Sequence, residues 1–471
     1  MTVAEIAASL PAVLWVGIAV LAVVFTAQAV RYVRADPMTR VSIRQAARIR
    51  RGWVRLARAQ GLSVTDRVPT AWSQISAGVN GGQGRTPEPR VLVPKIRVRP
   101  DRFGVEVRAK TLPRVGLADF QKAAPYLADA WRCTRVSVLP DGPGAVRIRG
   151  VRHDPLATRT EHVPSGESPA VVSRWALGLD EYASEVVVSL AEVPGVTVAG
   201  LPGFGKTSLI NKLICDLAPS PAVQFAVADG KASTAEEGDY ADVADRLFAF
   251  VGDDLAAGNE LFKRLVALRR SRSAAIRSAL GVRNMWHCGP CPAWPLTVLI
   301  IDEAHTFFRE HKGNDPATKK LAALASENAR LVEDLVKKGR SVGILVILAT
   351  QKATGDAIPT FIRDVCPVGL SFAQKTIEAA VAALGEDIRN WPEANPVTLQ
   401  DPTYVGVAVM TVQGREGFTR VRTPYVDDTH AARIAADTAH LTRDPAELLA
   451  GAEPLSPTEP EDWGGRGTEA A

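Results

Sequence analysis

Short apolar runs alternate with amphipathic segments between residues 173 and 423. The runs cover residues 186–190, 196–199, 225–227, 296–301, 344–349, 368–372 and 405–412. Apolar runs of this length, separated by helical patterns, are typical of buried strands in a mainly parallel sheet covered by helices. We therefore predict an α/β domain over residues 173–425.

Apolar and charged residues alternate from residue 90 onward. The alternation covers residues 91–99, 103–110, 135–140 and 145–151, and a helical pattern occupies residues 117–131. A period of two is typical of strands with one solvated face, so we predict a small α+β domain over residues 90–172. Its arginines could contact a phosphate backbone or could simply cover an ordinary solvated sheet face.

Residues 10–30 carry no charge, and this is the length of a bilayer-spanning helix. Glu5 precedes the run, and Arg31 and Arg34 follow it. By the positive-inside rule the N-terminus would lie outside and the rest of the chain in the cytoplasm. We predict a single-pass anchor in the cell membrane over residues 1–35, with a buried soluble helix as the alternative.

Arginines recur among apolar residues in the next segment, residues 40–60. A basic amphipathic helix beside a membrane span would lie on anionic lipid head groups, although a solvated linker helix has the same pattern. A glycine-rich stretch then indicates a flexible linker, which completes residues 36–89. At the other end, residues 426–471 are predicted to form a short helix and a disordered acidic tail. Within residues 40–60, the arginines that follow Arg40 are Arg44, Arg48, Arg50, Arg51, Arg55 and Arg58.

The chain of 471 residues has a net charge of +5 and five cysteines. Cysteines this sparse favour a reducing compartment rather than a disulfide framework. Cys288 and Cys291 form a C-x-x-C pair, but Pro292 and a new strand follow where a redox site would need a helix. A zinc site would need a second pair of ligands near His287. We interpret the pair as structural or incidental.

The sequence G-L-P-G-F-G-K-T occupies residues 200–207, between a buried strand pattern and a helical one. Strand, glycine-rich loop and helix form the context that a P-loop requires. The loop amides would face phosphates, Lys206 would reach the β and γ phosphates of ATP, and Thr207 would hold Mg²⁺. The predicted ATP-binding residues are Gly200, Leu201, Pro202, Gly203, Phe204, Gly205, Lys206, Thr207 and Ser208.

Two carboxylates, Asp302 and Glu303, end the apolar run 296–301. After a P-loop, Asp302 is expected to hold Mg²⁺ and Glu303 to polarise the attacking water. Gln351 ends the run 344–349 and could sense the γ-phosphate, or it could be a polar strand cap. Residues 302–305 also spell D-E-A-H, but the later arginine-rich element of such helicases is absent, so we treat the spelling as coincidence. The expected fold is therefore a RecA-like P-loop ATPase core.

Residues 339–364, G-R-S-V-G-I-L-V-I-L-A-T-Q-K-A-T-G-D-A-I-P-T-F-I-R-D, closely resemble the FtsK/SpoIIIE DNA translocases. So does D-G-K at residues 229–231, where that family usually has D-P-K. The resemblance covers about residues 90–425. The anchor, W-V-R-L-A-R at 53–58 and D-F-Q-K-A-A-P-Y-L-A-D-A-W-R-C at 119–133 are similar to FtsK-like transfer proteins of actinomycete conjugative elements.

The resemblance implies a hexameric ring that uses ATP hydrolysis to drive double-stranded DNA through its pore. Each site would then need an arginine from the neighbouring subunit. The corresponding region contains Arg269, Arg270 and Arg272, of which we choose Arg270, although a solvated helix face is the alternative. Arg340 and Arg363 are lesser candidates.

The expected role is conjugative DNA transfer, with other transfer proteins as possible partners. The alternatives are chromosome segregation, a protein-secretion or coupling ATPase of the same superfamily, and a non-hydrolysing tether.

The sequence departs from the family's pattern in two places. The segment between Glu303 and Arg340 is longer than usual and could form an exposed lobe or a surface loop. The residues after Tyr425 are too few for a DNA-reading winged-helix domain.

Overall fold

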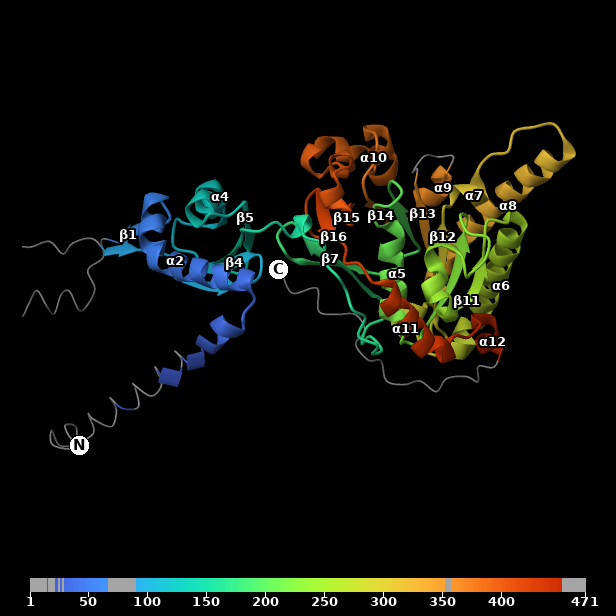
Figure 1. Ribbon diagram of the computed structural model, residues 1–471, viewed down its shortest axis with the longest axis horizontal. Helices are drawn as coiled ribbons and strands as arrows, with labels where there is room; N and C mark the ends of the chain where they lie inside the picture. Colours follow the sequence, from blue (N-terminus) through green and yellow to red (C-terminus); the bar gives the residue numbers. More distant parts are fainter. Residues whose placement is uncertain are drawn as a thin grey trace, which may run out of the picture. The chain divides into compact units, whose positions relative to one another are not determined.

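The chain divides into two compact units, one ending at Asp154 and the other beginning at Pro155 (Figure 1). The computed structural model describes Trp15 and residues 22–23, 26–27, 29–66, 90–351 and 357–450. The predicted boundary at residue 172 differs from this division. The reason is that the segment after Pro155 joins the C-terminal unit, where Glu161 forms a β-bridge with Tyr425.

The predicted membrane span, residues 10–30, falls largely outside the described residues. Within the part of the chain that the structure describes, no helix is both long enough and apolar enough to cross a bilayer. The predicted linker before residue 90 and the tail from residue 451 also lie outside that part.

The N-terminal unit contains a four-stranded antiparallel sheet in the order β3-β4-β6-β5. The helix predicted over residues 117–131 is confirmed as α4, and apolar residues from α2 and α4 share one core with alternate residues of the strands. A separate two-stranded sheet pairs β1 with β2. The elements are α2 (Pro37–Ala59), β1 (Val64–Asp66), β2 (Arg90–Leu92), β3 (Ile96–Pro100), β4 (Gly104–Lys110), α4 (Leu117–Trp131), β5 (Arg135–Pro140) and β6 (Ala145–Val151).

Helix α2 covers the basic segment that was expected to form a juxtamembrane or linker helix. It begins where the Asp36 carboxylate accepts hydrogen bonds from the first amides of the helix, with Pro37 in the first turn. One of its faces is buried in the core of the unit, and Trp53 Nε1 donates to the carbonyl of Pro94 at 2.7 Å. In the structure this helix shares one core with the strands that follow residue 90. The buried apolar residues of α2 are Ala46, Ile49, Trp53 and Ala57.

The C-terminal unit is built on a ten-stranded sheet in the order β11-β10-β12-β13-β9-β14-β15-β16-β7-β8. The first six strands are parallel, as predicted, and the last four form an antiparallel wing that the apolar runs did not indicate. The strands are β7 (Arg174–Asp180), β8 (Glu185–Ser189), β9 (Gly195–Ala199), β10 (Val223–Asp229), β11 (Leu247–Val251), β12 (Leu296–Asp302), β13 (Ile344–Thr350), β14 (Val368–Ser371), β15 (Val407–Thr411) and β16 (Phe418–Arg422).

Helices cover both faces of the parallel strands. One core contains Val298 and Ile300 of β12 with the apolar residues of α5 and α11, and a second contains Leu299 and Ile301 with those of α6, α7 and α8. The helices are α5 (Lys206–Leu217), α6 (Leu255–Leu280), α7 (His305–Phe308), α8 (Pro316–Gly339), α9 (Thr360–Arg363), α10 (Ile377–Leu384), α11 (Asp428–Thr438) and α12 (Pro445–Ala450).

The long segment after Glu303 forms α7, a loop and the start of α8. The first buried residue of α8 is Ala325, so its first turns project away from the sheet with the loop before them (Figure 1). Both expectations for this segment, a lobe and a loop, therefore hold in part. Beyond Tyr425, the expected short helix is α11, which packs beside α5.

Candidate active site

Residues 200–205 form a loop between β9 and α5, at the carboxyl edge of the parallel strands. Gly200, Gly203 and Gly205 adopt positive φ angles of 152°, 75° and 107°. A Cβ atom on Gly200 would lie 2.6 Å from the Cβ of Phe372, so a larger residue does not fit there. Among the described residues, no side chain caps the start of α5. The amides at this end are therefore open to an anion.

Lys206 lies folded against the loop with 6% of its surface exposed. Its Nζ donates to the carbonyls of Gly200 at 2.9 Å and Leu201 at 3.3 Å. Burial lowers the pKa of Lys206, and the carboxylates of Asp302 and Glu303 act in the opposite direction. The cation is thus placed where phosphate oxygens could replace the two carbonyls as acceptors.

Asp302 is held by three donors at the end of β12. Its Oδ2 accepts from Tyr240 OH at 2.9 Å and from Thr207 Oγ1 at 3.3 Å, and its Oδ1 accepts from the amide of Glu303 at 2.8 Å. Tyr240 is fully buried in η2 (Gly238–Arg246), and burial raises its pKa well above the ordinary value, which keeps the hydroxyl a donor. A threonine hydroxyl beside an aspartate carboxylate is a donor set that fits Mg²⁺.

Other carboxylates lie close to Asp302, among them that of Asp229. The register of β10 with β12 places Asp229 opposite Asp302. Burial, followed by the charges of Asp302 and Asp239, raises the pKa of Asp229 to about 6. Among the described residues, no group of three or more His, Cys, Asp or Glu forms a metal cage. An ion here would depend on waters and phosphate oxygens for its remaining ligands, as Mg²⁺ commonly does.

The side chains of Glu303 and Gln351 are in contact at the carboxyl edge of the parallel strands. Glu303 is 6% exposed and adopts φ of +46°, a conformation that costs energy for a residue with a side chain. Its Oε1 accepts from Gln351 Nε2, at the end of β13. Its Oε2 has no hydrogen-bond partner in the described chain, although His305 Nδ1 lies 3.4 Å away. One carboxylate oxygen of Glu303 is thus buried without a hydrogen-bond donor among the described residues.

The three candidate arginines of α6 have different environments. Arg269 pairs with Asp334 at 2.6 Å, and Arg272 is buried, donating to backbone carbonyls that include that of Pro295. Among the three candidates of α6, Arg270 is thus the one whose side chain is exposed. Of the lesser candidates, Arg340 is exposed and Arg363 donates to the carbonyl of Ala382 at 3.0 Å.

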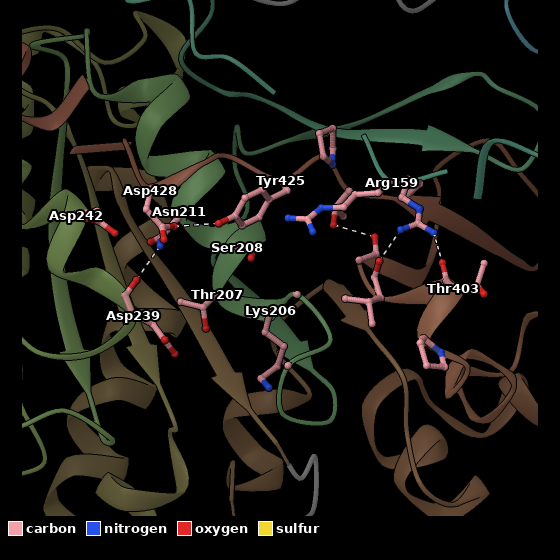
Figure 2. A pocket seen from close by; sticks show the side chains of 18 of the residues that line it. Arg159, Lys206, Thr207, Ser208, Asn211, Asp239, Asp242, Thr403, Tyr425 and Asp428 are labelled. Carbon is pink, nitrogen blue, oxygen red and sulfur yellow. Dashed lines mark hydrogen bonds between the residues drawn. The ribbon is translucent and has the colours of Figure 1, made fainter. Parts of the chain in front are cut away.

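A pocket of about 880 Å³ extends from the loop to residues remote in sequence (Figure 2). Gly203, Gly205, Lys206, Thr207 and Ser208 line one part of it, and Arg159 and Tyr425 line another. The Arg159 guanidinium carbon lies 4.5 Å from the centre of the Tyr425 ring.

Tyr240, Arg159 and Tyr425 were not predicted as site residues, because none belongs to a spaced motif. Leu201 and Phe204, two of the predicted ATP-binding residues, pack their side chains against a small core beside the loop.

Cys288 and Cys291 lie far along the chain from these residues and are free thiols. Cys288 Sγ donates to the carbonyl of Met285 at 3.3 Å, and burial raises the pKa of its thiol. A raised pKa makes a thiol less reactive, which favours the structural interpretation.

The fold and the site define a P-loop ATPase-like α/β unit. Residues 172–289 match the model of the FtsK/SpoIIIE family. The DNA translocase FtsK of Haemophilus influenzae is 28% identical over 301 residues, which cover 56% of this chain and 50% of that protein. The DNA translocase FtsK 2 of Ralstonia nicotianae is 28% identical over 229 residues, covering 42% and 27%. The chain thus spans half or less of the length of these relatives.

Two solved structures have a related shape. The pCW3 conjugation coupling protein TcpA, as a monomer with ATPγS, aligns with a TM-score of 0.47 and 16% identity, over 76% of this chain and 93% of that one. The cytoplasmic domain of the type VII secretion ATPase EccC from Thermomonospora curvata aligns with a TM-score of 0.44 and 18% identity, over 59% and 32%.

Proposed function

We propose that this protein is an ATP-driven translocase of double-stranded DNA. The observation that carries the proposal is the convergence of Lys206, Thr207, Asp302 and Glu303 on one edge of the sheet. The loop amides and Lys206 would hold the phosphates of ATP. Thr207 and Asp302 would hold Mg²⁺, which neutralises phosphate charge when bound. DNA as the moved polymer is supported by the match of residues 172–289 to the FtsK/SpoIIIE family.

Glu303 would accept the proton of the attacking water through Oε2, the oxygen that accepts no hydrogen bond from the described chain. Gln351, hydrogen-bonded to the other oxygen, would orient the Glu303 carboxylate and respond to the γ-phosphate. The contact between these two side chains supports a coupled role.

The site also needs a cation for the charge that develops during phosphoryl transfer. Arg422 lines the pocket, but its guanidinium donates to the carbonyls of Leu156 and Thr403, within its own chain. We propose that Arg270 of a neighbouring subunit completes the site in a hexameric ring. The exposure of Arg270, beside the engaged Arg269 and Arg272, supports this choice.

We further propose that the ring is anchored to the cell membrane through residues 1–35, with its motor in the cytoplasm, and that it moves DNA during conjugative transfer with other transfer proteins. The uncharged run at residues 10–30 supports the anchor. The resemblance of residues 119–133 to the transfer proteins supports the role.

ATP hydrolysis by the full chain, with and without duplex DNA, tests the proposed motor. We expect duplex DNA to stimulate turnover and Lys206→Ala to abolish it, because the variant loses the phosphate-binding cation. Lys122→Ala, an exposed lysine of α4, is the matched control. Stimulation by a peptide substrate instead of DNA would favour a protein-secretion motor, and no turnover with either polymer would refute the proposal.

Mixing two inactive variants tests the shared site. Arg270→Ala and Lys206→Ala should each lack turnover alone. Mixed rings place an intact loop beside an intact Arg270, so the mixture should regain part of the activity. Arg277→Ala, exposed on the same helix, should remain active by itself. A mixture that stays inactive although mixed rings form would rule out Arg270 as the residue supplied in trans.

A further inference from the structure

One face of the N-terminal sheet is lined by arginine and lysine. Residues such as Val98, Val107 and Ile148 point into the core shared with α2 and α4. Because successive side chains of a strand point to opposite faces, the residues between them lie on the other face. We call Arg97, Arg99, Arg108, Lys110, Arg147 and Arg149 the basic face. One acid of the strands, Glu106 of β4, lies among them, 3.3 Å from Arg108.

The register sets like charges opposite one another. Arg97 of β3 is paired with Arg108 of β4, and Arg108 is paired with Arg147 of β6, so three arginines form a row across three strands. Like charges directly opposite each other destabilise a sheet. Asp141 relieves part of the repulsion by pairing with Arg147 and, at 3.4 Å, with Arg108. The row therefore works against folding, which suggests that it serves a ligand.

Several cations at this edge are not engaged in ion pairs among the described residues. They are Lys95, Arg97, Arg99 and Lys110. A groove of about 680 Å³ is lined by Lys95, Arg97, Arg108 and Lys110, with Asp141 as its acidic residue. The groove is thus positively charged and open to an anionic ligand.

We propose that the basic face binds the phosphate backbone of double-stranded DNA, in addition to the contacts made by the motor unit. Neighbouring strands are about 4.8 Å apart, and residues on one face of a strand are about 7 Å apart, so the cations form a rigid two-dimensional array. A duplex carries one charge per about 1.7 Å of its axis and can engage many of them at once.

A lipid surface fits the basic face less well. Membrane-surface elements need an apolar side that enters the bilayer. Among the strands of this sheet, the exposed large apolar side chain is a single residue, Leu139 of β5. The choice of DNA over another polyphosphate rests on the proposed function.

Salt-dependent binding of a labelled duplex to the full chain without nucleotide tests the inference. The triple variant Arg97→Gln, Arg99→Gln, Lys110→Gln should bind about tenfold more weakly, and the slope of log K against log salt should fall by about 3, or one per lost phosphate contact. The matched control is Arg48→Gln, Arg55→Gln, Arg58→Gln. These arginines lie on the exposed side of α2, which packs against the opposite face of the sheet, so binding should change little.

The outcomes separate this inference from the proposed function. If the wild-type chain binds DNA and the triple variant keeps its affinity and slope, the basic face is not a DNA site, whereas the motor proposal stands. Equal losses in both triple variants would indicate only a net-charge effect and would also overturn the inference. If the wild-type chain does not bind duplex DNA, the proposed function itself fails.

Two further measurements complete the test. The thermal midpoint of the triple variant should not fall below that of the wild type, since Arg97→Gln removes a like-charge contact, and its DNA-independent ATP turnover should match that of the wild type. Loss of binding to phosphatidylglycerol vesicles with DNA affinity retained would assign the face to lipid and refute its assignment to DNA.

Discussion

The two sheets of this protein place their charged residues in different positions. Every residue of β9, β10, β12 and β13 is buried, so the charged residues of these strands, Asp229 and Asp302, stand where the strands end. In the N-terminal sheet one face is solvated, and the charges lie along the strands. A sheet covered on both faces offers chemistry only at its edge, whereas a half-covered sheet offers a surface.

This difference accounts for the kinds of site that each sheet provides. At the edge of the parallel strands, residues far apart in sequence converge on one point, as Thr207 and Asp302 do at 3.3 Å. Such convergence suits the binding of one small ligand. The basic face presents its cations in rows, which suit an extended partner. The following predictions test both halves of the comparison.

The largest effect is expected at the edge of the parallel strands. Glu303→Gln removes the carboxylate that would accept the proton of water, so ATP turnover should fall by about 100-fold or more while ATP binding is retained. Glu310→Gln, an exposed acid paired with Lys312, is the control. Binding of a fluorescent ATP analogue and steady-state turnover are the measurements. Loss of binding in Glu303→Gln would contradict the assigned role.

A smaller effect is expected at Tyr240, which donates a hydrogen bond to Asp302, the proposed Mg²⁺ ligand. Tyr240→Phe removes a donor to Asp302 and keeps the ring that fills the core. We expect the Mg²⁺ concentration for half-maximal turnover to rise by about tenfold, with activity restored by excess Mg²⁺. Tyr126→Phe, an exposed tyrosine of α4, should behave like the wild type. A lower maximal rate with unchanged Mg²⁺ dependence would mean that Tyr240 acts only on packing.

The carboxylate cluster should also give a pH-dependent stability. Because the folded state raises the pKa of Asp229 from 3.8 to about 6, the folded protein holds this proton more tightly than the unfolded chain. The contribution of Asp229 to stability is therefore present below pH ~4 and lost as the pH rises toward ~6. Asp229→Asn cannot ionise and should gain stability relative to the wild type across this range.

Denaturation midpoints at each pH, without Mg²⁺ or nucleotide, check the Asp229 prediction. Asp253→Asn, an exposed aspartate before α6, provides the comparison. A difference between Asp229→Asn and the wild type that stays constant from pH 4 to 6 would show that Asp229 does not titrate there.

The smallest effect concerns the opposed arginines. Arg97→Gln removes one member of the like-charge row and should raise the free energy of unfolding of the N-terminal unit by about 0.2–1 kcal/mol. Arg99→Gln is a sharp control, because Arg99 stands opposite Glu106 and its loss should not stabilise the sheet. Fluorescence of the buried Trp53 and Trp131 reports this unit. If both variants shift equally, or if high salt leaves the difference intact, opposed charges are not the cause.

Local patterns in the sequence determined much of this protein. The P-loop, the acids that end β12 and helix α4 were all predicted within a residue or two, since each depends on neighbours close along the chain. The alternation in β3 and β4 likewise predicted a half-solvated sheet.

Tertiary structure decided what depends on distant partners. Only folding brings Tyr240 to Asp302, stacks Arg159 on Tyr425, and buries Arg272 while leaving Arg270 exposed. Only the register of three strands places Arg97, Arg108 and Arg147 in one row. The physical reason is that periodicity records which face of an element is buried, whereas the identity of the group opposite that face is set by packing between elements far apart in the chain.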